Sequence, residues 1–254
     1  MVADQLRERI ISGDLEDGAE LPTLSGLIEE FSVSPPSIRQ ALRILEHEGL
    51  ITVRRGNVGG AVVHHPSIDG VAYSLGLVLQ TRGLLTGDLA IAVRDLLTLC
   101  ATLCARRRDR ASAVLPALRR AHEASIELVD GPELEYERTM RDFHRALVEG
   151  SGNGTLEVVF STIEWLWLAQ TEAFPARVDP GTPPDLKLRR KAGRDHAAIL
   201  EAIRAGDTVA VERSMRAHLS HPEILGLDAT DGERIRATSL TPGLRSALVG
   251  RLAD

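Results

Sequence analysis

The spacing of hydrophobic positions divides the chain into a mixed first part and a helical second part. Up to about residue 65, short helical stretches alternate with strand-like ones, whereas apolar residues recur at helical spacing from about residue 85 to Leu219. A polar stretch, His64-His65-Pro66-Ser67, separates the two patterns. We therefore expect a first domain over residues 1–65, a linker over 66–84, a helical domain over 85–221 and a tail over 222–254.

Three short helices and a β-hairpin are predicted in the first domain. The helices cover residues 2–12, 24–31 and 35–48, with Thr23 and Ser34 as N-caps of the second and third. Two strands, 51–54 and 61–64, flank a glycine-rich loop. This order of elements is that of a winged helix-turn-helix, in which the third helix enters the major groove of DNA and the second braces it.

The second part is predicted to be an antiparallel helical bundle. A linking helix and turn over 67–84 precede it, and a short helix is expected in the tail at 242–251. The bundle helices are expected over 86–108, 111–129, 132–149, 155–174, 187–205 and 207–221. The fold class is therefore mainly α, with a winged helix-turn-helix and its small β-hairpin before an all-α bundle.

Composition limits the class of protein further. Hydrophobic residues make up 43% of the 254 and aromatic residues only 3%, so aliphatic side chains must build the core. We expect no signal peptide at the charged start, no membrane span and a cytoplasmic location. Cys100 and Cys104 share one helix face and are interpreted as reduced core thiols.

Charge complicates the prediction of DNA binding. The net charge is −6, and the first 65 residues hold six Arg and no Lys against ten Asp and Glu. Neutralisation of phosphates supplies much of the affinity for DNA, so this balance counts against nucleic-acid binding. A local basic face can still suffice, and the positions of the arginines matter more than their sum.

The first domain contains an ordered set of short motifs. They are Leu21-Pro22-Thr23, Val33-Ser34, Ile38-Arg39-Gln40-Ala41-Leu42, Leu45-Glu46-His47-Glu48-Gly49-Leu50 and Arg55-Gly56 with Gly59-Gly60. Together they resemble the DNA-binding domain of the GntR family. Ser25 and Ser34-Pro35 depart from the family pattern, which usually has Arg in the bracing helix and Ser-Arg at the start of the recognition helix.

The resemblance implies a set of DNA contacts, and Arg39 matches the recognition-helix arginine of the family. We expect Arg39, Ser34, Ser37 and Thr23 to contact phosphates or base edges. Arg54, Arg55 and the wing glycines, Gly59 among them, are expected to support these contacts. Because two frequent family contacts are missing, the operator sequence should differ from the family norm.

The second part resembles the FadR-type C-terminal domain of one GntR subfamily over about residues 70–221. The motifs that carry this resemblance are Phe143-His144-Arg145-Ala146-Leu147, Ser151-Gly152-Asn153, His196-Ala197-Ala198-Ile199-Leu200-Glu201-Ala202-Ile203, Gly206-Asp207 and Met215-Arg216-Ala217-His218-Leu219. The resemblance implies an effector-binding domain. It further implies that Arg94 pairs with an effector carboxylate, the alternative being a surface ion pair. Asn153 is either an effector ligand or a loop or helix-cap residue.

Three histidines lie on apolar helix faces: His144, His196 and His218. Buried imidazoles need partners, and a shared metal ion supplies one. In metal-binding members of the resembled family the matching histidines are ligands, together with an Asp whose position is Met140 here. Two alternatives stay open: the histidines hold a divalent ion (Zn, Ni or Mn) that a carboxylate effector completes, or no metal binds and they hydrogen-bond the effector directly.

These observations predict a ligand-responsive transcription regulator, expected to be a repressor and not an enzyme. It would bind a palindromic double-stranded operator as a homodimer and take a small organic acid in the helical domain. One alternative is a metal-dependent hydrolase on the three histidines, although the sequence offers no HExxH motif and no clear general base. Another is a winged helix used only for protein contacts, which the acidic first domain would suit.

Overall fold

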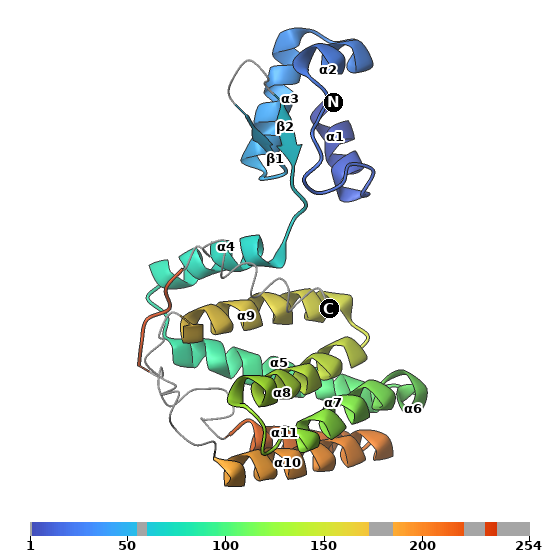
Figure 1. Ribbon diagram of the computed structural model, residues 1–254, viewed down its shortest axis with the longest axis vertical. Coiled ribbons are helices and arrows are strands. Elements are labelled where there is room, and N and C mark those ends of the chain that lie inside the picture. The colour runs from blue at the N-terminus through green and yellow to red at the C-terminus, as the bar shows by residue number, and fades with distance from the viewer. Residues whose placement is uncertain (1, 55–59, 173–184, 221–231, 238–254) are drawn as a thin grey trace. The chain divides into compact units, whose positions relative to one another are not determined.

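The computed structural model describes residues 2–54, 60–172, 185–220 and 232–237 (Figure 1). The chain forms two compact units, Met1–Gly70 and Val71–Asp254. The predicted helix over 242–251 lies outside the described residues.

The first unit has the helices α1 (Val2–Ile11), α2 (Leu24–Phe31) and α3 (Pro35–His47), followed by the strands β1 (Ile51–Val53) and β2 (Ala61–Val63). The strands pair antiparallel, with Ile51 opposite Val63. Apolar side chains of α1, α3 and the hairpin form one buried cluster; its members are Leu6, Ile10, Leu21, Leu45, Leu50, Ile51, Ala61 and Val63. The winged helix-turn-helix prediction is confirmed.

The two predicted helix caps differ in their hydrogen bonds. Thr23 caps α2, because its Oγ1 accepts the backbone N–H of Gly26 at 3.3 Å. Ser34 occupies the N-cap position of α3, but its hydroxyl makes no capping bond and lies 2.9 Å from the hydroxyl of Ser37. Pro35 and Pro36 supply no N–H to cap, and the N–H of Ser37 donates to the carbonyl of Ser34.

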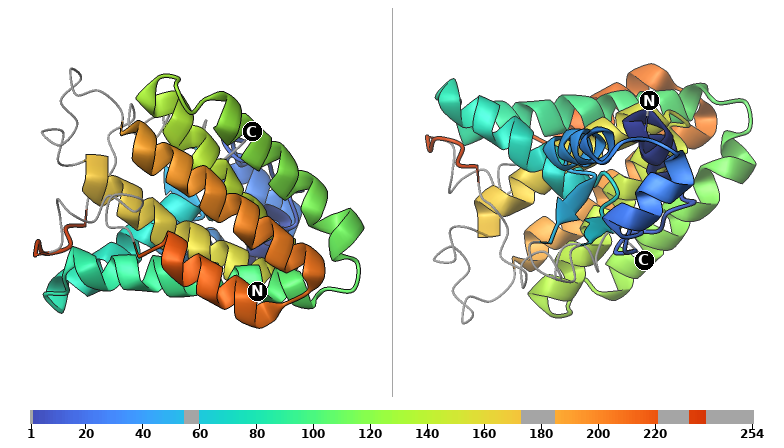
Figure 2. Two further views of the ribbon diagram at one scale, coloured as in Figure 1. Left: turned by 90° about the horizontal axis from the view of Figure 1, so that it is seen from below. Right: turned by 90° about the horizontal axis from the view of Figure 1, so that it is seen from above.

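The second unit is a bundle whose helices surround α5 (Figures 1 and 2). After α4 (Ile68–Thr81), the helices are α5 (Thr86–Arg106), α6 (Arg110–Ala113), α7 (Leu115–Glu127), α8 (Glu133–Gly150), α9 (Gly154–Glu172), α10 (Leu186–Ala205) and α11 (Thr208–His218). Helix α5 packs on α8, α9, α10 and α11. Cys100 and Cys104 are fully buried on it, and the Cys104 thiol donates to the Leu147 carbonyl at 3.1 Å.

One predicted helix is divided in two. The apolar spacing predicts a continuous helix over 111–129, but the structure has α6 and α7 with a break at Val114. Pro116 lies in the first turn of α7, and its ring nitrogen cannot donate the hydrogen bond that would continue α6. Hydrophobic spacing does not register this break, because Leu115 and Leu118 remain buried on both sides of the proline.

The predicted tail contains a docked segment. Residues 233–237 are extended, and Ile235 is only 1% exposed. Sequence pattern gave no sign of this burial, because one apolar residue among polar ones carries no periodicity.

Because the first unit has its own buried core, we expect it to unfold independently of the second unit. Leu6→Ala removes a fully buried side chain of α1 and should lower the free energy of unfolding of this unit by about 2–5 kcal/mol. Both tryptophans, Trp165 and Trp167, lie in the second unit, so tryptophan fluorescence in urea should stay unchanged while circular dichroism gains an earlier transition. Ile11→Ala, on the same helix but 61% exposed, is the control. A common shift of both signals would show that the units unfold together.

Candidate functional site

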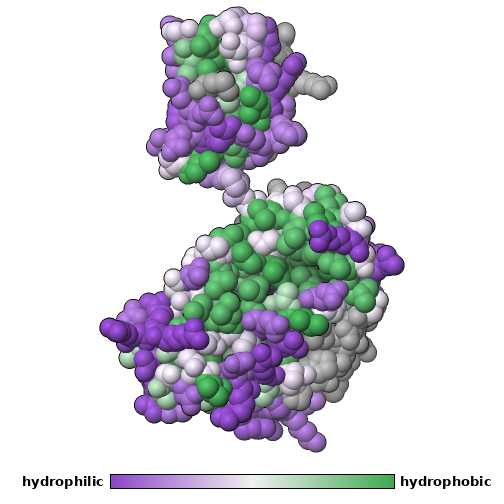
Figure 3. Space-filling model, turned by 180° about the vertical axis from the view of Figure 1, so that it is seen from behind, coloured by the Kyte–Doolittle hydropathy of each residue, from purple (hydrophilic) through white to green (hydrophobic). Residues whose placement is uncertain are grey.

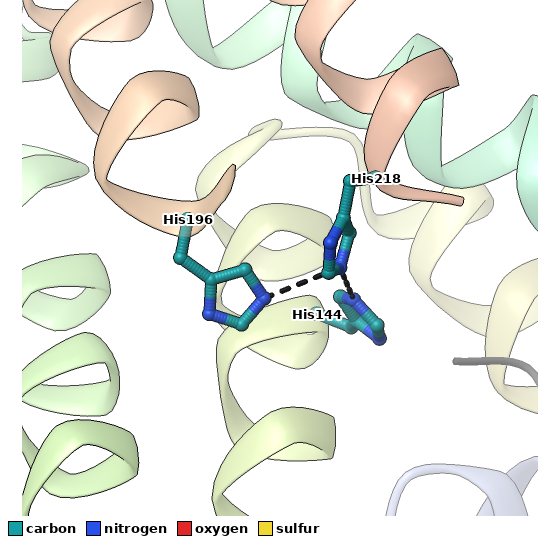
Figure 4. A group of neighbouring side chains, drawn as sticks. All are labelled: His144, His196 and His218. Carbon is teal, nitrogen blue, oxygen red and sulfur yellow. Dashed lines mark hydrogen bonds between the residues drawn. The ribbon is translucent and has the colours of Figure 1, made fainter. Parts of the chain in front are cut away.

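Three imidazole rings meet inside the second unit (Figure 4). His144 comes from α8, His196 from α10 and His218 from the last position of α11. The Nε2 atom of His218 lies 3.2 Å from Nε2 of His144 and 3.3 Å from Nε2 of His196. One ligand atom from each ring lies within 4.8 Å of the other two, and all three residues are buried.

Neighbouring side chains hold these rings in place. The ring of Phe143 stacks on that of His196 with centroids 3.7 Å apart and an interplanar angle of 11°. Asp195 of α10 places Oδ2 at 3.5 Å from Nδ1 of His218, and the same oxygen accepts from Lys191 Nζ at 2.6 Å. A carboxylate on Nδ1 favours the tautomer whose Nε2 lone pair faces the other two rings.

Burial keeps the cluster neutral. Desolvation, with smaller contributions from His218 and Arg141, lowers the pKa of His144 to about 3. The pKa of His196 is also well below its usual value, chiefly through burial and secondly through His218 and His144. Burial by itself would raise the pKa of Asp195, but hydrogen bonds from His218 and Lys191 outweigh it and lower that pKa. Neutral imidazoles beside an ionised carboxylate are the forms that bind metal ions.

Donor chemistry at this point fits a divalent metal ion. A ring nitrogen offers one hydrogen or one lone pair, so Nε2 of His218 cannot make a good hydrogen bond to both of its neighbours. Two nitrogens on one tetrahedral zinc, with bonds of about 2.0–2.1 Å, lie about 3.3 Å apart, which is close to the two separations observed here. The residues that would hold an ion are His144, His196 and His218.

The family's fourth ligand has no counterpart at its usual position. Met140 is half-buried on α8, and Asp142 does not join the three histidines among the described groups at ligand distance. Among the described His, Cys, Asp and Glu side chains, only the three histidines lie together at ligand distance.

The two other predicted effector residues lie in different surroundings. Arg94 of α5 is about one-third exposed, and its Nε donates to Asp95 at 3.1 Å. Asn153 is exposed, and its Oδ1 accepts the backbone N–H groups of Thr155 and Leu156 at the start of α9. The geometry thus gives Asn153 the helix-cap role that the sequence left open.

The arginines of the first unit are divided between internal ion pairs and one helix face. Arg7, Arg9 and Arg54 pair with Glu48, Glu30 and Glu20 respectively. Arg39 and Arg43, four residues apart on α3, are exposed and have no ion pair within the described part of the chain. Arg43 was not singled out from the sequence, although its spacing from Arg39 places it on the same face.

The remaining predicted DNA contacts come from the starts of α2 and α3 and from the hairpin. Thr23, Ser34 and Ser37 are exposed at the starts of α2 and α3. Arg54 is 62% exposed but donates to Glu20 at 2.6 Å. Arg55 and Gly59 lie outside the described residues.

A winged helix-turn-helix joined to a helical domain with a buried polar site defines a DNA-binding transcription regulator with an effector domain. The chain belongs to the gntR family of bacterial regulatory proteins, whose model matches residues 1–62, and the FCD domain model matches residues 90–221. No helix in the described residues is long and apolar enough to cross a membrane.

Relatives and solved structures agree with this assignment. The chain is 28% identical over 225 residues to the HTH-type transcriptional repressor NanR of Citrobacter rodentium, covering 87% of this chain and 82% of that one. It is 27% identical over 222 residues to NanR of Enterobacter sp., with the same coverage. The structure of Streptococcus agalactiae GntR has a TM-score of 0.58 at 24% identity and covers 86% of this chain and 95% of that chain, which supports the fold.

Burial of His144 predicts a pH dependence of stability. Its pKa is about 3 in the folded chain against 6.5 ordinarily, so between these values the unfolded chain binds a proton that the folded chain does not. In chelator, His144 by itself should therefore lower the free energy of unfolding of the second unit by about 1.4 kcal/mol for each pH unit below about 6.5, and His196, whose pKa is also lowered, should steepen the slope. Urea unfolding followed by tryptophan fluorescence measures this slope. His144→Gln should reduce it, and His65→Gln, in the first unit, should leave it unchanged; equal slopes in all three proteins would contradict the assignment.

Proposed function

We propose that this regulator binds a palindromic operator as a homodimer and that a small carboxylate in the helical domain controls the binding. The carboxylate would be bound at a divalent transition metal (Zn, Ni or Mn) held by His144, His196 and His218. The convergence of three buried Nε2 atoms is the observation that carries this proposal. An ion bound there supplies open coordination positions that suit carboxylate oxygens.

The protein's own residues prepare the site for such a ligand. Asp195 orients His218, Phe143 holds the ring of His196, and burial keeps the rings unprotonated. Arg94 remains our candidate for a second contact to the carboxylate. Its present ion pair with Asp95 is partly exposed, and such pairs contribute little stability, so an effector can displace it.

Recognition of DNA is proposed to rest on the outer face of α3. Arg39 and Arg43 offer guanidinium groups that the unit's acidic residues do not neutralise within the described chain. A guanidinium group forms bidentate hydrogen bonds with guanine edges and with phosphates. Two such groups one helical turn apart can therefore contact the bases of one operator half-site. The net charge of the unit therefore does not exclude this face, because Arg39 and Arg43 are exposed and have no ion pair within the described residues.

A homodimer is supported by an apolar face on the second unit. Figure 3 shows hydrophobic side chains gathered on the side that α4 and α5 form. The exposed large residues there are Val71, Tyr73, Leu77 and Val78 on α4 and Ile91 and Leu99 on α5. Apolar patches of this kind mark interfaces, and a two-fold dimer matches the symmetry of a palindromic site.

The DNA interface is tested by removing each arginine. Arg39→Ala and Arg43→Ala should each weaken binding to the DNA upstream of the chain's own gene by about 5- to 150-fold, and each lost phosphate contact should lower the salt slope by about 0.9. Fluorescence anisotropy over a salt series gives both quantities. Arg9→Ala, whose guanidinium pairs with Glu30, is the matched control. If neither variant changes binding, the winged helix serves protein contacts instead.

The metal site is tested by metal content. Protein purified without an affinity tag or chelator should contain about one transition-metal ion per chain by plasma mass spectrometry, and the double variant His196→Ala, His218→Ala should contain none. Asp195→Asn should keep the site but weaken Zn affinity by about 10–100-fold, because His218 loses its orienting carboxylate. Glu201→Gln, exposed on the same helix, is the control. Absence of metal after incubation with Zn, Ni and Mn salts would leave the direct hydrogen-bonding alternative.

A further inference from the structure

Residues 233–237 lie beyond the end of the FCD match at residue 221, yet they are docked on the second unit. The backbone N–H of Thr86 donates to the carbonyl of Glu233 at 2.9 Å, and the N–H of Ile235 donates to Leu84 at 3.0 Å. Leu85 and Arg234 form the antiparallel bridge between these bonds. The segment, here called the strap, is therefore hydrogen-bonded to the α4–α5 turn through one isolated β-bridge.

The other end of the strap is bound by two glutamines from different helices. Gln170, fully buried near the end of α9, donates its Nε2 to the carbonyl of Arg236 and accepts the N–H of Arg236 at Oε1, both at 2.9 Å. Gln80 of α4 accepts the N–H of Ala237 at 2.7 Å. A buried amide that pairs with both backbone groups of one residue fixes that residue in place, because breaking the pair leaves buried polar groups unsatisfied.

Gly76 lets the three segments approach one another. A Cβ atom built on Gly76 of α4 would lie 3.0 Å from Leu166 of α9 and 3.4 Å from the Cα of Ala237 in the strap. The absence of a side chain thus allows α4, α9 and the strap to meet at one point. Ile235, buried beside them, adds apolar contact to the hydrogen bonds.

Helix α4 is held to the bundle differently from the other helices. Its direct packing against other named helices of the described chain is slight, in contrast to the extensive packing among α5 and α7–α11. It is also the first helix after the DNA-binding unit, since only residues 64–67 separate it from β2. Helix α9, at the other end of the clamp, packs on α8, which carries His144.

We propose that the strap clamps α4 to α9 and makes the order of α4 respond to occupancy of the three-histidine site, with Gln170 as the positioning residue. This coupling rests on the metal site proposed above. Binding at His144 stabilises α8, the α8–α9 packing carries the effect to Gln170, and the strap passes it to the helix that joins the DNA-binding unit. Such a link requires a measured coupling between the two ends.

Hydrogen exchange of the α4 amides tests the clamp without DNA or effector. Two proteins lack the clamp: the variant Gln170→Leu and a chain ending at residue 231. In both, exchange of the α4 amides should be about 10- to 30-fold faster, which is the factor expected for loss of two buried hydrogen bonds. A chain ending at residue 237, which keeps the strap, is the matched control and should exchange as the full chain does. Peptides of α10 should be unchanged in every protein, which shows that the bundle stays folded. Unchanged α4 exchange in both strap variants would overturn the clamp.

Addition of Zn²⁺ to the same proteins, after a chelator has removed any bound metal and has itself been removed, tests the coupling. In the full chain and the chain ending at 237, Zn²⁺ should slow exchange in α10 and in α4; in the two strap variants it should slow α10 alone. Slowing of α10 without α4 in the full chain would overturn the coupling while leaving the metal site intact. If Zn²⁺ does not change exchange in α10, both the metal site and the coupling are rejected. The clamp is judged separately, by exchange of the α4 amides without Zn²⁺.

Discussion

Burial of three imidazoles at one point is the constraint around which the effector domain is arranged. Each ring comes from a different helix, and α8, α10 and α11 must therefore keep a fixed mutual position for the Nε2 atoms to meet. Removing the rings from water disfavours their protonated forms and leaves lone pairs that need a partner. Asp195 orients the ring of His218, and stacking on Phe143 orients the ring of His196. The site is thus prepared before any ligand arrives.

The first unit separates its charges in space, and this separation matters more than their sum. An acidic winged helix is a poor match for DNA if its charges are spread evenly. Here glutamates neutralise Arg7, Arg9 and Arg54 elsewhere on the unit, whereas Arg39 and Arg43 remain on the outer face of α3. Pro35 stands at the start of α3 where the resembled family usually has an arginine, and the proposed DNA contacts therefore lie farther along the helix, at Arg39 and Arg43.

The link that we propose between the two functions includes a segment beyond the end of the FCD match. Helix α4 packs little on the bundle by itself, and a segment beyond the FCD match supplies the contacts that hold it. Gly76 lets α4 approach α9 and the strap because it has no side chain, and Gln170 hydrogen-bonds to the backbone of Arg236 in the strap. No described hydrogen bond joins Gln170 to the histidines, so the proposed coupling would act through the helices between them.

The sequence by itself determined the element order, the winged helix-turn-helix and the three inward histidines, because hydrophobic periodicity and helix signals are local properties. The break at Val114 and the cap by Asn153 are also local, since Pro116 and the N–H groups of Thr155 and Leu156 lie within three residues, although hydrophobic spacing did not reveal them. Tertiary structure alone decided that the three Nε2 atoms converge, that Asp195 faces His218 rather than its neighbour His196, and that residues 233–237 dock on the second unit. These last features depend on contacts between residues far apart in the chain, and the spacing of residues along a sequence does not specify which distant partners will meet.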